Sequence, residues 1–190
     1  THSVFSQTDV IGYFQQHYTT MRLIIILAFL SLIISGCNSP RKKYFEYDEI
    51  DYYFNSYDES KIGDLYDNQS KSEIDSLKMG VILGEIPKNI TDLSFIEKLK
   101  EMGYEKRSIE KAQFGEIDKI FVEKSVKDNF ATSCIYVYRD ILIFKRDKKV
   151  IGTAKVCFGC MANEITGTTA NTNNFGQDGD YNKLEKILRK

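Results

Sequence analysis

Two stretches in the C-terminal third of the chain, "CIYVYRDILIFK" (residues 134–145) and "KVIGTAKVCF" (residues 149–158), are rich in β-branched and aromatic residues. The polar tripeptide "RDK" (146–148) separates them. Two such runs around a short polar turn are typical of antiparallel strands that form a β-hairpin. The sequence therefore predicts a central hairpin with strands at about 134–145 and 149–158.

Other stretches predict the elements that pack around this hairpin. Residues 50–57, "IDYYFNSY", indicate a further strand, whereas residues 114–124 fit either a helix or a strand. Apolar residues recur every three or four positions, as in amphipathic helices, at residues 70–82, 91–103 and 180–190. Together these patterns predict an α+β fold in which two to four helices, including one at the C-terminus, pack on a small antiparallel sheet.

An earlier part of the chain has the layout of a secretory signal. Met21 and Arg22 open a short positive region, a twelve-residue apolar core runs from Leu23 to Ile34, and Ser35-Gly36 come directly before Cys37. A helix that crosses a hydrocarbon core of about 30 Å needs about 20 apolar residues. The apolar core is therefore expected to be part of a signal peptide rather than a membrane-spanning helix.

The sequence Ile34-Ser35-Gly36-Cys37 resembles the lipobox of bacterial lipoproteins. The resemblance covers residues 21–37 and implies that Cys37 receives a diacylglyceryl group and becomes the acylated N-terminus of the mature protein. Several acyl chains would hold the protein stably on a lipid bilayer. This anchor would place it in the cell envelope, and at the outer membrane if the host has two membranes. In the alternative, the signal is an ordinary secretory one and Cys37 is an unmodified thiol.

These features divide the chain into four parts. Residues 1–20 precede the first methionine and are interpreted as an over-called start or as added residues. Residues 21–36 are the expected lipoprotein signal peptide, residues 37–46 a lipidated tether, and residues 47–190 a single α+β domain.

Histidine is absent after residue 37, because both histidines of the sequence, His2 and His17, precede the signal peptide. Ser-His-Asp triads, Cys-His pairs and histidine metal sites therefore lack a required residue. The formal net charge is −1, and lysines are interspersed with acidic residues, so nucleic acid is not an expected partner. We expect no cofactor, and a binding role rather than an enzymatic one.

Three cysteines follow Cys37, namely Cys134, Cys157 and Cys160. If a three-residue turn joins the two hairpin strands, Cys134 lies directly opposite Cys160, at a separation that a disulfide requires. This register predicts a structural Cys134–Cys160 bond and leaves Cys157 as a buried thiol or a partner for disulfide exchange.

Two other uses of these cysteines remain open. Cys157 and Cys160 have the Cys-x-x-Cys spacing of a thiol-redox site, although the residues after them make a poor helix. All three thiolates of Cys134, Cys157 and Cys160, joined by Met161 or Glu164, would form a soft ligand set that suits Cu(I) better than zinc.

A glycine- and asparagine-rich stretch after the hairpin, "ANEITGTTANTNNFGQDGDYN" (162–182), is predicted to be a long loop. It is a candidate ligand loop because Asn171, Asn173, Asp178 and Asp180 supply oxygen donors. It does not fit the EF-hand pattern, because Phe175 stands where an oxygen ligand belongs. We therefore prefer a structural loop in which Phe175 fills the core and Asp178 or Asp180 caps the last helix.

The region from the hairpin to the last helix also looks like a group of small bacterial lipoproteins with no known activity. The sequence as a whole favours a membrane-anchored envelope lipoprotein that acts as a non-enzymatic binding or structural module for an unknown envelope protein or ligand. The alternative is an extracytoplasmic thiol-redox or soft-metal-binding protein that uses Cys157 and Cys160 with Cys134.

Overall fold

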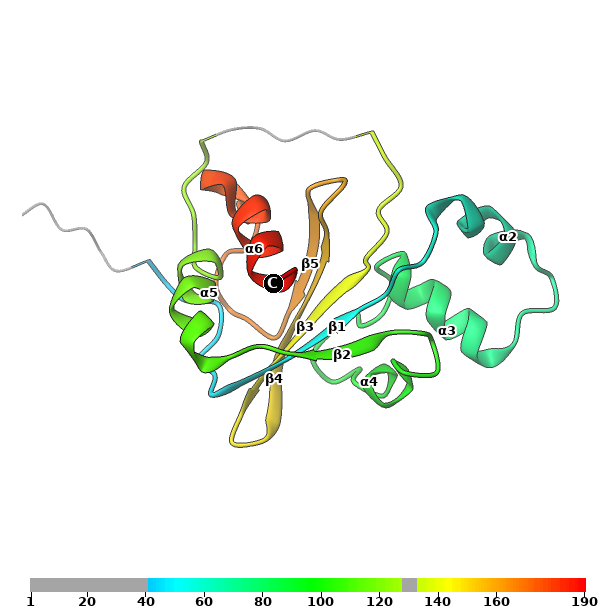
Figure 1. Cartoon of the computed structure of the whole chain (residues 1–190), viewed down its shortest axis with the longest axis horizontal. Coiled ribbons are helices and arrows are strands. Elements are labelled where there is room, and N and C mark those ends of the chain that lie inside the picture. The colour runs from blue at the N-terminus through cyan, green and yellow to red at the C-terminus, as the bar shows by residue number, and fades with distance from the viewer. Residues whose placement is uncertain (1–40, 128–132) are drawn as a thin grey trace, which may run out of the picture. The chain divides into compact units, whose positions relative to one another are not determined.

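The computed structural model describes residues 41–127 and 133–190, which form one α+β unit around a five-stranded sheet (Figure 1). The strand order is β2-β1-β3-β4-β5, and every neighbouring pair is antiparallel. The strands are β1 (Glu49–Phe54), β2 (Glu105–Ser108), β3 (Asp140–Arg146), β4 (Lys149–Cys157) and β5 (Ala162–Thr166). The predicted α+β class with an antiparallel sheet is confirmed.

The described residues hold five α-helices and three short 3-10 turns. These are η1 (Glu59–Lys61), α2 (Ile62–Asp67), α3 (Glu73–Ile82), α4 (Phe95–Lys98), η2 (Lys111–Gln113), α5 (Phe114–Ile120), η3 (Gln177–Gly179) and α6 (Asp180–Leu188). The predicted C-terminal helix is confirmed as α6. None of the helices within residues 41–127 and 133–190 has the length and apolar character needed to cross a membrane.

Helices cover both faces of the sheet, which explains the uninterrupted apolar run in β3. Leu142 and Phe144 pack in one core with residues of α5 and α6, whereas Ile141 and Ile143 pack in a second core with residues of α2, α3 and α4. The same division is visible in Figure 1, where α5 and α6 lie on one side of the strands and α2 to α4 on the other. All four side chains are fully buried, because successive residues of a strand point to opposite faces.

The hairpin is present, but its first strand is shorter than predicted. β3 begins at Asp140 instead of residue 134, because backbone groups before it bond to other elements. The Tyr138 N–H donates to the Ile82 carbonyl at 2.9 Å, and the Tyr104 hydroxyl donates to the Tyr138 carbonyl at 2.8 Å. The backbone of Tyr138 therefore bonds to Ile82 of α3 and to Tyr104, and the segment 134–139 does not continue the ladder with β4.

The turn between β3 and β4 has two residues rather than three. Asp147 and Lys148 both have positive φ, at 50° and 63°, as tight hairpin turns with the right twist require. An irregularity between Phe144 and Lys145 then shifts the ladder, so that Phe144 pairs with Gly152, whereas a three-residue turn without this irregularity would pair it with Val150. Because the shift is of two residues, Leu142 and Phe144 lie on the same face in both registers.

The packed unit begins earlier than the boundary predicted at residue 47. Tyr44 and Phe45 are buried in the core of the α5 and α6 side, and Lys43 forms a β-bridge with Val122. The part of the predicted tether from residue 41 to 46 therefore belongs to the domain. The predicted signal peptide, Cys37 and residues 1–20 lie outside the described residues.

Two polar strands were not predicted. β2 has no buried side chain, and β5 lies within the stretch that the sequence assigned to a long loop. Both are edge strands, which pair through backbone groups and need no apolar face of their own. The stretch at 114–124, which fitted either state, contains helix α5, and Phe121 follows it in the core.

Candidate functional site

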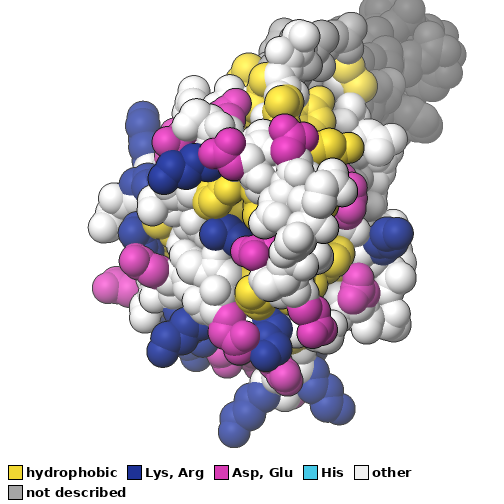
Figure 2. Space-filling model, turned by 90° about the vertical axis from the view of Figure 1, so that its right-hand side faces the viewer, with side chains coloured by type: hydrophobic (Ala, Val, Ile, Leu, Met, Phe, Trp, Pro, Cys, Tyr) yellow, Lys and Arg dark blue, Asp and Glu magenta, His cyan; other side chains and the backbone are white. Residues whose placement is uncertain are grey.

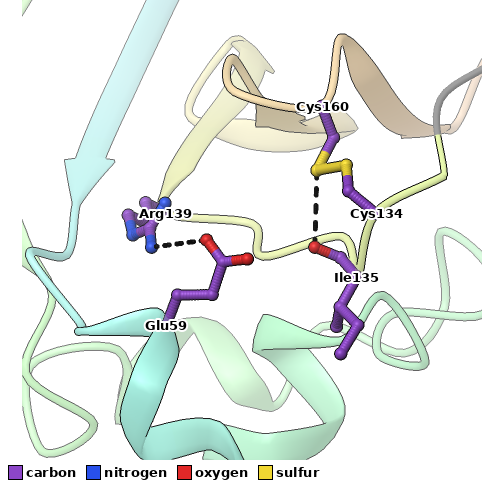
Figure 3. The surroundings of a disulfide bond; sticks show 5 residues. All are labelled: Glu59, Cys134, Ile135, Arg139 and Cys160. Carbon is purple, nitrogen blue, oxygen red and sulfur yellow. Dashed lines mark hydrogen bonds and ion pairs between the residues drawn. A yellow bond between two sulfur atoms is a disulfide. The ribbon is translucent and has the colours of Figure 1, made fainter.

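The cysteines form a covalent link between the segment before β3 and the turn after β4 (Figure 3). Cys134 and Cys160 are joined by a disulfide, with their Cα atoms 6.2 Å apart. This is the pair that the sequence predicted, although Cys134 lies outside the β3–β4 ladder. On the other side of the same segment, the Arg139 Nε donates to the Tyr57 carbonyl at 2.8 Å. The disulfide therefore fixes the start of the segment 134–139, which lies outside the β3–β4 ladder.

Cys157 is a free thiol buried in a small cluster with Tyr138 and Cys160. It is the last residue of β4, and β5 rather than a helix follows the Cys-x-x-Cys sequence. A thiol-redox cysteine is usually activated at a helix N-terminus or beside a cation, and Cys157 has no such helix after it. Residues 41–127 and 133–190 contain no group of three His, Cys, Asp or Glu side chains arranged to hold a metal ion.

The oxygen donors of the candidate ligand loop do not converge on one point. The Asn171 N–H donates to the Glu123 carboxylate at 2.8 Å, and the Asn171 side chain accepts the Asn173 N–H at 3.0 Å. Asp178 pairs with Lys127. Asn171 and Asp178 therefore have structural partners, and these partners, Glu123 and Lys127, belong to one short segment that follows α5.

That segment, residues 123–127, is bound along its length by the loop. The Asn174 side chain donates to the Lys124 carbonyl at 3.0 Å, and the Lys127 N–H donates to the Gln177 side chain at 3.1 Å. Phe175 is buried in the core between them, as predicted. The loop is thus a clamp that fixes the chain after α5.

Asp180 does not cap the last helix, and neither does Asp178. The N-cap of α6 is Gly179, with φ of 71°, and no side chain bonds to the first helical N–H groups there. Asp180 instead forms an ion pair with Lys124, at 2.9 Å between Oδ2 and Nζ, and both side chains are almost completely buried. Burial raises the pKa of Asp180, and the hydrogen bond from Lys124 opposes this shift.

A second buried polar cluster lies where α6 ends against the sheet. Asp140 accepts a hydrogen bond from the Tyr52 hydroxyl at 2.6 Å, and Arg189 donates to both Asp140 and Tyr52. The Arg189 guanidinium also stacks on the ring of Phe54, 4.3 Å from its centroid. Burial raises the pKa of Asp140, although the bonds from Tyr52 and Arg189 act in the opposite direction.

This cluster borders a surface cleft of about 540 Å³. Tyr52 forms part of its wall, and the side chains of Arg107, Glu110 and Lys190 give it charges of both signs. The carboxylate of Asp140 is paired with Arg189, at 2.8 Å between Oδ1 and Nη1. The sequence did not indicate this cluster. The only signal was an acidic residue placed directly before the apolar run of β3.

The third buried polar group is Lys155, in the middle of β4. Its side chain is fully buried, its Nζ donates to the Ile86 carbonyl at 2.7 Å, and it lies 5.2 Å from the centre of the Tyr138 ring. Burial lowers the pKa of Lys155 to about 8, and Glu164 and Glu85 act in the opposite direction. Its ammonium group is therefore held by a backbone carbonyl and an aromatic ring inside the domain. It too was not indicated by the sequence.

The outer surfaces of α5 and α6 border a groove in which six of the fourteen lining residues are lysines, and we call it the α5–α6 groove. It consists of two adjoining hollows of about 440 and 560 Å³ that share Lys119 and Lys183. The basic residues lining it are Arg41, Lys43, Lys119, Lys124, Lys183, Lys186 and Lys190, and the acidic ones are Glu116, Asp118, Asp178 and Asp180. It was missed from the sequence, because its lysines come from three separate segments.

Comparison of the chain with protein-family models, with curated proteins and with solved structures finds no match. Its function is therefore inferred from its own residues.

Proposed function

We propose that this protein is a bacterial envelope lipoprotein, anchored to a bilayer through an acylated Cys37, whose domain is a non-enzymatic binding or structural module. The observation that carries the proposal is the sequence Ile34-Ser35-Gly36-Cys37 at the end of a short apolar core. The packed domain follows this candidate anchor closely in sequence, because Tyr44 and Phe45, seven and eight positions after Cys37, are buried in its core.

The arrangement of the polar groups supports a non-enzymatic role. General acid–base catalysis needs a titratable group within hydrogen-bond reach of a substrate. The buried groups described above, Asp140, Lys155 and Asp180, are each bonded to other protein groups. Their partners are structural, because Asp140 contacts Arg189, Asp180 contacts Lys124, and Lys155 contacts the Ile86 carbonyl.

The test uses the full chain expressed in a bacterium and recovered from the membrane fraction. We expect an intact mass that starts at Cys37 and carries a diacylglyceryl group, and partition into the detergent phase on phase separation. The variant Cys37→Ala should retain the signal sequence and carry no lipid, whereas Cys157→Ala should be lipidated normally. A protein that is cleaved before Cys37 without gaining lipid would overturn the proposal.

A second candidate function is thiol–disulfide exchange, and one observation favours it. Cys157 packs in the same small cluster as Cys160. The Cys157 thiolate would attack the Cys160 sulfur and form a Cys157–Cys160 bond, and Cys134 would leave as a thiolate, with no net change of oxidation state. Alkylation of Cys134 under non-denaturing conditions, abolished by Cys157→Ser, would support this exchange. Absence of such alkylation would exclude it.

A further inference from the structure

We propose that the α5–α6 groove faces the bilayer and binds anionic phospholipid headgroups, so that the acyl anchor and the groove together hold the domain in one orientation. This inference rests on the proposed anchor at Cys37. The groove would then act as a second attachment that sets which side of the domain is presented to other envelope components.

The charge of the groove is the first support. Seven basic and four acidic side chains line its two hollows. Two of the acidic ones are engaged with basic residues of the groove, because Asp118 lies 2.7 Å from Lys43 and Asp180 lies 2.9 Å from Lys124. A third, Asp178, pairs with Lys127 at the edge of the groove.

Five exposed cations remain after this pairing: Arg41, Lys119, Lys183, Lys186 and Lys190. Lys183 is 3.8 Å from Asp180, and the other four make no ion pair among the described residues. Clusters of four or more such cations close to a membrane anchor are attracted to anionic lipids. The groove therefore presents a net positive surface in a chain whose net charge is −1.

The position of the groove relative to Cys37 is the second support. Arg41 lines the groove, and residues 42–44 are fixed beside it, because the Glu123 N–H donates to the Lys42 carbonyl and the Tyr44 N–H to the Phe121 carbonyl, both at 2.9 Å. Four residues from Cys37 to Arg41 span at most about 14 Å when fully extended. An anchor at Cys37 therefore keeps the end of the groove that contains Arg41 within about 14 Å of the acylated residue.

The chemistry of the lining favours lipid phosphates over nucleic acid. The groove offers lysine ammonium groups, which bind phosphates as point charges, and no aromatic side chain on which a base would stack. The end of the molecule that carries α2 to α4 differs, because basic and acidic side chains are interspersed over it (Figure 2). A membrane-facing side and a side facing away are thus distinguished by charge.

The full lipidated protein is reconstituted into vesicles of phosphatidylcholine alone or with about a third of phosphatidylglycerol. The test measures how fast each lysine side chain reacts with a water-soluble amine-labelling reagent. We expect Lys119, Lys183, Lys186 and Lys190 to react several-fold more slowly in the anionic vesicles, and high salt to restore their rates. The reference lysines Lys61, Lys88 and Lys100, which are exposed outside the groove, should react equally in both.

A pair of matched variants gives a second readout. In the wild type, anionic vesicles should slow the cutting of the domain by chymotrypsin, which does not cut at lysine. The variant K119Q/K183Q/K186Q/K190Q should stay anchored but be cut equally fast in both kinds of vesicle. The control variant K61Q/K88Q/K100Q/K149Q changes the same number of exposed charges elsewhere, and should keep the protection that anionic vesicles give.

The outcomes separate this inference from the proposed function. If the intact mass shows lipid on Cys37 and the groove lysines are protected, both stand. If lipid is present and the groove lysines react equally in both vesicles, the groove inference is overturned and the anchor is retained. If Cys37 carries no lipid, the proposed function fails and the groove inference fails with it.

Discussion

The Nζ of Lys124 lies 2.9 Å from the Oδ2 of Asp180, and only 4% and 1% of the two side chains are exposed. Asp180 is the first residue of α6, and Lys124 belongs to the segment of chain that the long loop clamps. The ion pair therefore joins the C-terminal helix to the end of the α5 region across 56 positions of sequence.

Breaking this ion pair should destabilise the fold strongly. Lys124→Met leaves the buried Asp180 with only the more distant Lys183, and Asp180→Leu leaves Lys124 with only the Lys119 carbonyl. Each change should cost about 3 kcal/mol of unfolding free energy. The double variant should be more stable than the sum of the two single effects predicts, because neither charge is then left buried. Urea unfolding followed by circular dichroism measures all four proteins.

The exposed pair Lys127–Asp178 is the matched control, since it lies in the same loop with 53% and 29% of its side chains exposed. Lys127→Met should lower the unfolding free energy much less than Lys124→Met does, because solvent screens an exposed pair. Equal losses for Lys124→Met and Lys127→Met would show that the buried pair contributes nothing special.

Arg189 should be important for the stability of the domain, whereas Lys190 should not. Arg189→Ala removes both the partner of the buried Asp140 and the cation that stacks on Phe54. We expect a loss of about 2 kcal/mol, less than for a fully buried pair, because 32% of the Arg189 side chain is exposed. Lys190→Ala should leave the unfolding midpoint unchanged. Indistinguishable midpoints for the two variants would refute the role assigned to Arg189.

Because of Lys155, the free energy of unfolding should increase as the pH is raised above about 8. Its pKa is about 8 in the folded state, because of burial, and about 10.4 in an unfolded chain. Between these values the unfolded state binds more protons, so the contribution of Lys155 to stability rises with pH, by up to about 1.4 kcal/mol per unit. Below pH 8 both states are protonated and its contribution is constant.

The measurement is the difference in unfolding free energy between the wild type and Lys155→Met from pH 7 to 10. We expect Lys155→Met to be the more stable protein at pH 7 and the difference to shrink as pH rises. Lys149→Met, at an exposed position of the same strand, should show a constant difference. A constant difference for Lys155→Met as well would contradict a lowered pKa.

The disulfide should stabilise the domain, because it closes a loop in the unfolded chain and so lowers the entropy of the unfolded state. The bond joins residues 26 positions apart, and a loop of this size contributes about 3 kcal/mol by restricting the unfolded chain. Cys134→Ser and Cys160→Ser should each lose about this amount, and a reductant should abolish the difference from wild type. Cys157→Ser keeps the bond and should lose much less, unless Cys157 takes part in exchange.

Gly152 should not tolerate a side chain, because a Cβ atom there would overlap the ring of Phe45. Gly152→Ala is expected to cost about 1–3 kcal/mol by overpacking. The loss should shrink when it is combined with Phe45→Ala, which also tests whether residues 41–46 belong to the packed domain. Gly115→Ala in α5, where no atom lies within 4 Å of the new Cβ, should be neutral or stabilising.

Local periodicity allowed part of the fold to be predicted. The apolar run Ile141–Phe144 required a strand, and the spacing of Leu184, Ile187 and Leu188 required an amphipathic helix whose apolar face is buried. The face on which each β3 side chain lies was also predictable, because it depends only on alternation. The register expected from a three-residue turn differs from the observed one by two residues, and a shift of two residues leaves each side chain on the same face.

The edge strands and the start of β3 required the tertiary structure. β2 and β5 carry no apolar pattern, and they are strands only because β1 and β4 offer free backbone groups beside them. β3 starts at Asp140 because Ile82 and Tyr104 take the backbone groups before it.

The sequence by itself determined the candidate lipobox, the absence of histidine after residue 37, the α+β class and the buried face of α6. Only the tertiary structure decided which polar residues meet. Lys124 with Asp180, Asp140 with Arg189, and the lysines of the α5–α6 groove come from distant segments. The physical reason is that periodicity is a property of neighbouring residues, whereas a buried charge is stable only where the folded chain brings a partner within hydrogen-bond distance.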